Sequence, residues 1–307
     1  MDTHLLELLS ASLSASLSAS LPAHKRQTVV DLANALAETA GVVAVVLGGS
    51  YARGAARPTS DVDLGIYYYP DAPFRVDAIA QIAQAAAVQP PTVTDFYAWG
   101  AWVNGGAWLH TASGKVDFLY RNLEQVTRTI AEAEQGVVHH DYPQQPPYGF
   151  YSITYLAETQ ICLPLFDPAG VIRALKARVE HYPEPLHQRV VNDALWSAEF
   201  TLLQARGFAA QGDVYNTAGC LTRVATNLTQ VLFALNRCYY MSDKGALQMI
   251  DKFALKPDDY AQSLGDILAA PGRDAPTLSR TVAALEDLWR RTVALTNGAY
   301  RPKFVMT

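Results

Sequence analysis

The chain has 307 residues, of which 50% are hydrophobic and 17% charged, and its formal net charge is −5. This length suits two domains, and this composition excludes a chain that is disordered over most of its length. The sequence contains no dense run of Lys or Arg, which disfavours a protein that grips long nucleic acid through many phosphates.

The three cysteines, Cys162, Cys220 and Cys238, stand far apart and form no CxxC pair. They are typical of reduced thiols rather than of a disulfide framework or a zinc site. The N-terminus lacks the basic segment of a secretory signal, and no run of about 18 apolar residues occurs. We therefore expect a cytoplasmic protein without a membrane span.

Residues 1–24 contain the run LSASLSASLSASL, whose leucines recur every four residues. This period places the leucines on one stripe, which predicts an N-terminal amphipathic helix that ends at Pro22. A membrane-bound helix is the alternative, but the segment lacks the basic face that such helices carry.

Residues 25–145 alternate between the hydrophobic periods of helices and strands, which predicts an α/β (α+β) domain. We expect helices over 26–40, 73–87 and 122–134 and strands over 42–47, from Asp61 onward and over 115–120.

The segment HHDYPQQPPYGF, residues 139–150, is rich in proline and turn formers and predicts a domain boundary. Residues 146–307 follow a helical period almost throughout, which predicts an all-α bundle. We expect helices near 151–161, 169–181, 185–210, 214–239, 242–254 and 275–297.

The stretch LGGSYARGAARPTSDVDLGIYY carries the chemistry. Gly49 and Ser50 directly follow a strand, and Asp61 and Asp63 follow Ser50 by 11 and 13 residues. Side chains alternate along a strand, so both aspartates face one side. Two carboxylates about 5 Å apart repel by roughly 3 kcal/mol at an effective dielectric near 20, and Mg²⁺ between them removes this cost. The glycines let the backbone approach a phosphate closely.

A further acid, Asp117, lies inside the apolar strand VDFLY. An ionised residue in such a strand needs a partner that offsets its desolvation. If this strand lies beside DVDL, Asp117 completes a three-carboxylate site for two metal ions, which orient a triphosphate and activate an attacking hydroxyl.

The combination of Gly49-Ser50 after a strand, Asp61-Val62-Asp63 and the later lone Asp117 resembles the signature of the DNA polymerase β-like nucleotidyltransferase superfamily. The resemblance implies a mixed sheet followed by a helical domain. It also implies that Asp61, Asp63 and Asp117 bind two Mg²⁺ ions and catalyse transfer of a nucleoside monophosphate from ATP or another NTP, with release of pyrophosphate.

Relatives within this superfamily imply further nucleotide contacts. Ser50 and Ser60 match phosphate-binding serines of antibiotic adenylyltransferases, with a turn serine and a cap as the alternatives. Arg53 either reaches a phosphate or pairs with a nearby acid. The segment ALNRCYYMSDKGALQMIDKF resembles the helical region of aminoglycoside adenylyltransferases, in which a lysine binds ATP phosphates across the interdomain cleft. Lys244 stands at that position, with an exposed lysine as the alternative.

Two acceptor classes compete. The first is a small molecule, such as an aminoglycoside or lincosamide antibiotic, which would make this a resistance enzyme. The second is tRNA or a protein, as in toxin-type nucleotidyltransferases of toxin–antitoxin systems. The length, the two-domain layout and the acidic charge favour the first. A homodimer is compatible with the resemblance. Trp99, Trp102 and Trp108 are expected in the core or as cleft lining, with base stacking as the alternative.

Overall fold

The computed structural model describes residues 21–304 and divides the chain into two compact units. The first unit contains the chain up to Ile130 together with Tyr155–Glu180, and the second contains Ala131–Thr154 and the chain from His181 onward. The predicted LSAS helix lies largely outside the described residues.

The first unit is built on a six-stranded sheet with the order β3-β4-β5-β2-β1-β8. Strands β2 and β5 run parallel, and every other neighbouring pair is antiparallel. The predicted mixed sheet is confirmed. Its strands are β1 (Ala44–Leu47), β2 (Val62–Tyr68), β3 (Thr92–Val93), β4 (Gly106–Thr111), β5 (Gly114–Asn122) and β8 (Leu163–Phe166).

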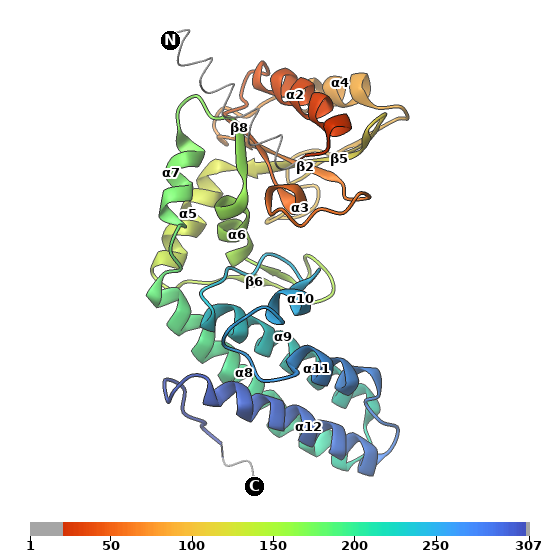
Figure 1. Ribbon diagram of the computed structural model, residues 1–307, viewed down its shortest axis with the longest axis vertical. Helices are drawn as coiled ribbons and strands as arrows, with labels where there is room; N and C mark the ends of the chain where they lie inside the picture. Colours follow the sequence, from red (N-terminus) through yellow and green to blue (C-terminus); the bar gives the residue numbers. More distant parts are fainter. Residues whose placement is uncertain (1–20, 305–307) are drawn as a thin grey trace. The chain divides into compact units, whose positions relative to one another are not determined.

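Helices α2 (Ala23–Ala37) and α4 (Val76–Ala86) lie side by side over one face of this sheet (Figure 1). The strands present alternate residues to them, and the resulting core is fully apolar in its centre. It includes Leu36 of α2, Ile79 of α4, Leu64 of β2 and Phe118 of β5, all buried. Because side chains alternate, the residues between these core positions point to the opposite face of the sheet.

Helix α6 (Ile153–Ile161) packs on the opposite face through an ion pair. The guanidinium of Arg121, which is 5% exposed, donates to both carboxylate oxygens of Glu158 at 2.9 and 2.8 Å. The ring of Tyr155 lies 5.7 Å from the same guanidinium. This pair holds α6, and with it the return segment that supplies β8 and α7 (Val171–Arg178), against the first unit.

The second unit is a helical bundle with a two-stranded hairpin. Helices α8 and α9 pack along each other, and α12 packs on both. Asp213 caps α9, and a capping box of Asp274 and Thr277 begins α12. The elements are β6 (His140–Asp141), β7 (Phe150–Tyr151), α8 (Glu184–Ala210), α9 (Val214–Leu235), α10 (Ala246–Ile250), α11 (Tyr260–Ala269) and α12 (Ala275–Ala294). Within residues 21–304, the structure contains no helix long and apolar enough to cross a membrane.

The ion pair between Arg121 and Glu158 yields a stability prediction. Glu158→Gln leaves a buried guanidinium without its counter-charge, so the free energy of unfolding should fall by about 2 kcal/mol. Urea unfolding followed by circular dichroism measures this loss. Asp77→Asn is the matched control, because Asp77 pairs with Arg75 on the exposed surface and should leave stability nearly unchanged. Equal effects of the two substitutions would contradict a structural role for the buried pair.

Candidate active site

The turn after β1 is shaped around Asp63. The backbone N–H of Gly48 donates to the carbonyl oxygen of Asp63 at 2.8 Å, and the chain then enters the short helical turn α3 (Gly49–Ala52). Gly49 has φ of +59°, and a Cβ atom there would lie 1.7 Å from Oδ2 of Asp63. Only glycine therefore lets this turn lie directly against the carboxylate.

Asp63 of β2 lies directly opposite Asp117 of β5 in the parallel pair. Both side chains are partly buried, whereas their neighbours Val62 and Val116 are buried in the core. The strand of Asp117 therefore does lie beside the strand DVDL, and the carboxylates of Asp63 and Asp117 share one face of the sheet. Asp61 immediately precedes β2 and adds a third negative charge near them.

The ionisation of Asp117 is shifted by its surroundings. Its partial burial and the negative charge of Asp61 raise the pKa of Asp117 to about 6, against the smaller opposing effects of Lys115 and His110. The site therefore concentrates negative charge at a place where water solvates it poorly.

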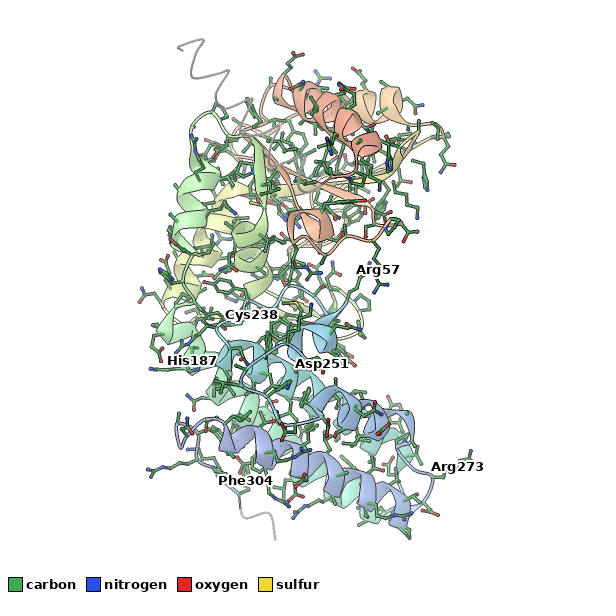
Figure 2. The ribbon with its side chains drawn as sticks, viewed as in Figure 1. Arg57, His187, Cys238, Asp251, Arg273 and Phe304 are labelled. Carbon is green, nitrogen blue, oxygen red and sulfur yellow. The ribbon has the colours of Figure 1, made fainter. Side chains whose placement is uncertain are left out.

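The loop between α3 and β2 is held by a lysine that sequence reasoning did not single out. Lys25 of α2 is 5% exposed, and its ammonium donates to the carbonyl oxygen of Ser60 at 2.7 Å. The ammonium also lies 5.1 Å from the ring of Tyr51. The hydroxyl oxygen of Ser60 accepts from the backbone N–H of Arg57, an exposed residue of this loop labelled in Figure 2. Lys25 thus positions the segment that leads into Asp61.

The remaining predicted contacts lie in both units. Ser50 lies within α3, and Arg53 ends it, so both are at the turn that meets Asp63. Lys244 belongs to the second unit, where it is exposed and precedes α10. Its contact with a nucleotide stays a prediction.

The residues fit a hard divalent cation. Among residues 21–304, no three His, Cys, Asp or Glu side chains are gathered closely enough to form a ready-made metal cluster. Mg²⁺ does not need one, because it takes one or two carboxylates and completes its shell with water and substrate phosphates. Asp63 and Asp117 are opposed on one face with Asp61 nearby, and all three supply carboxylate oxygen donors.

With this geometry in view, the family comparison is decisive. The model of the nucleotidyltransferase domain family matches residues 29–107, which contain the Gly49 turn, Asp61 and Asp63. The chain carries a nucleotidyltransferase domain. The protein is accordingly a nucleotidyltransferase enzyme, and the family resemblance expected from the sequence is confirmed. Asp117 lies beyond the end of this match. A domain of unknown function (DUF4037) matches residues 152–244.

Solved structures with a similar chain course include a nucleotidyltransferase-like protein from Exiguobacterium sibiricum, with 9% identity and a TM-score of 0.44. That match covers 91% of this chain and 78% of the other. An aminoglycoside 6-adenyltransferase from Bacillus subtilis has 11% identity and a TM-score of 0.33, with 92% and 93% covered. The curated proteins yield no match. The acceptor in the name of the Bacillus enzyme is a property of that protein.

The close approach at Gly49 predicts a selective loss of function. Gly49→Ala should push the Asp63 carboxylate aside and abolish the rise in melting temperature that Mg²⁺ and a non-hydrolysable NTP analogue produce. Gly54→Ala is the matched control, because Gly54 has φ of +67° but no atom within 4 Å of its Cβ position. Both variants carry the same kind of left-handed strain, about 1 kcal/mol. If Gly54→Ala also lost the ligand response, the defect of Gly49→Ala would be due to backbone strain and not to the contact with Asp63.

The raised pKa of Asp117 predicts a pH-dependent gain in stability. A carboxyl whose folded pKa of about 6 exceeds its unfolded value near 4 destabilises the fold once it ionises. This penalty is absent below pH 4, grows between pH 4 and 6, and is complete above pH 6. In metal-free buffer, Asp117→Asn should therefore raise the melting temperature at pH 7.5 and not at pH 4. Asp71→Asn, on an exposed turn, is the control and should change neither. A gain that is equal at both pH values would refute the electrostatic origin.

Proposed function

We propose that the protein transfers a nucleoside monophosphate, with ATP as the expected donor, onto a hydroxyl of a small-molecule acceptor. The observation that carries the proposal is the direct opposition of Asp63 and Asp117 beside the Gly49 turn. A turn of this kind brings backbone close to a triphosphate, and opposed carboxylates supply the ligands of its cation.

In this mechanism Asp61 and Asp63 would hold Mg²⁺ together with the triphosphate, and Asp117 would be the third metal ligand. When bound, Mg²⁺ neutralises charge on the phosphate oxygens and on the departing pyrophosphate. Gly49 and Ser50 face the phosphates, and Arg53 and Ser60 stand at the two ends of the loop that flanks them. Rigid placement by strands and by Lys25 favours an aligned attack.

Asp117 acts on the acceptor. The acceptor oxygen forms a bond to the α-phosphorus, the bond between that phosphorus and the bridging oxygen breaks, and pyrophosphate leaves. The hydroxyl proton passes to the Asp117 carboxylate. A base with a raised pKa retains a proton better than an ordinary aspartate, which suits this step near neutral pH.

A small-molecule acceptor is favoured by charge. The net charge of −5 and the lack of basic runs disfavour a long polyanion such as tRNA. The segment around Lys244 resembles the helical region of antibiotic adenylyltransferases, so an aminoglycoside or lincosamide antibiotic is the first acceptor class to test, with resistance as its consequence. A cytoplasmic location is part of the proposal, and the three free cysteines support it.

Charge-removing substitutions separate the two aspartates of the opposed pair. Asp117→Asn should keep Mg²⁺-dependent nucleotide binding, because the carboxylates of Asp61 and Asp63 remain. It should lower transfer by roughly 10²- to 10⁴-fold, because the base is lost. Asp63→Asn should lose nucleotide binding and transfer together. Isothermal titration with a non-hydrolysable analogue measures binding, and radiolabel from α-labelled NTP measures transfer to antibiotics and, in parallel, to total tRNA.

Three results would contradict the proposal. An Asp117→Asn enzyme with the wild-type rate would remove Asp117 from the chemistry. An Asp63→Asn protein with unchanged nucleotide affinity would remove the metal assignment. Label on tRNA and on no small molecule would move the enzyme to the toxin-type class.

A further inference from the structure

A tryptophan lies beside the proposed base. In the antiparallel pair of β4 and β5, Trp108 lies directly opposite Asp117. Directly opposed residues point to the same face, with Cβ atoms about 5 Å apart. Asp63, Asp117 and Trp108 therefore form one row across three adjacent strands, on the face that α2 and α4 do not cover.

Trp108 is not a core residue. Its side chain is 44% exposed, whereas its strand neighbours Ala107 and Leu109 are buried on the other face. The ring stacks on Trp99 with centroids 4.2 Å apart and an angle of 27° between the planes. Two large indoles that remain partly in water forgo much of the burial that normally stabilises a tryptophan. Because this exposed aromatic surface contributes so little to the core, it indicates a role other than core packing.

The backbone makes room for this pair. Gly106 lies two residues before Trp108 and hence on the same face, and a Cβ atom there would lie 3.1 Å from Cη2 of Trp99 and 1.8 Å from the carbonyl oxygen of Phe118. The missing side chain lets the Trp99 ring lie over the strand and support Trp108 from one side. The indole stack is thus built into the sheet.

The charges on this face indicate the chemistry of a ligand. Along β4 and β5, Lys115 and His110 stand on the same face as Asp117, and the guanidinium of Arg121 is held by Glu158. Lys115 alone provides too little positive charge to bind the phosphate backbone of a nucleic acid. An indole face instead attracts the C–H face of a saturated ring, or a cation. The nearby carboxylates also favour a cation.

We propose that Trp108, supported by Trp99, is the platform on which the ring of the acceptor stacks, and that this stacking sets the reactive hydroxyl beside Asp117. This inference rests on the proposed function. The substrate class is a compact hydroxylated ring, uncharged or positively charged. Trp108 is a binding and positioning residue, and it takes no part in proton transfer.

The test compares Trp108→Ala and Trp108→Phe with a matched control. Trp196→Ala removes another exposed tryptophan, which stacks on Phe200 of α8 in the second unit. The probes are a panel of cyclic sugars and amino sugars, a set of linear polyols, and total tRNA, each with α-labelled NTP. Melting temperatures without ligand verify that each variant folds.

Trp108→Ala should raise KM for ring acceptors about tenfold and leave KM for NTP unchanged, as expected for loss of one stacking contact of about 1.4 kcal/mol. Trp108→Phe should recover part of the affinity, and Trp196→Ala should match the wild type. Linear polyols should be poor acceptors that do not respond to Trp108→Ala.

An unchanged KM for ring acceptors in Trp108→Ala would overturn the platform, and so would a panel in which tRNA alone is labelled. Direct titration of ring compounds onto Asp117→Asn, with a non-hydrolysable NTP analogue present, separates the two hypotheses. There the ring should still bind, and an added Trp108→Ala should weaken this binding about tenfold. Loss of ring binding in Asp117→Asn alone would overturn the platform, whereas wild-type transfer by Asp117→Asn would overturn only the role of the base.

Discussion

The parallel, in-register pairing of β2 with β5 is the constraint on which the site depends. It sets Asp63 opposite Asp117, and the antiparallel partner β4 extends the same row to Trp108. A shift of one residue in the pairing register would point these side chains into the core. The buried residues on the other face, such as Leu64 and Phe118, prevent that slip, so packing energy on one side of the sheet fixes the geometry of the charged side.

Two buried cations hold the surroundings of this row. Lys25 ties α2 to the loop that leads into Asp61, and Arg121 ties β5 to α6. Each makes its bonds where burial would otherwise penalise its charge, so each link is specific as well as strong. Neither cation bonds to the opposed carboxylates of Asp63 and Asp117.

Much of this could be predicted from the sequence. Alternation along DVDL and the apolar context of Asp117 predicted shared faces, and long helical periods predicted α8, α9 and α12 within a few residues. Several elements were not predicted, among them β4, β8 and α11. Strand β4 begins at a glycine and exposes Trp108 and His110, β8 is four residues long and contains Pro164, and α11 follows a loop without a clear start signal. Short strands carry little period, and the positions of Lys25 and Glu158 depend on tertiary contacts that no local pattern encodes.

Two glycines show how the backbone determines what this face can bind. A side chain at Gly49 would collide with the Asp63 carboxylate, and a side chain at Gly106 would collide with the strand beside it and with Trp99. Each glycine lowers the local stability of its element, because the unfolded chain has more freedom to lose there. In return, one brings backbone against Asp63, the proposed metal ligand, and the other lets the Trp99 indole lie against the strand that carries Trp108. Under the proposed function, the row would take a phosphate at the Gly49 end and a ring at the Gly106 end, with Asp117 between them.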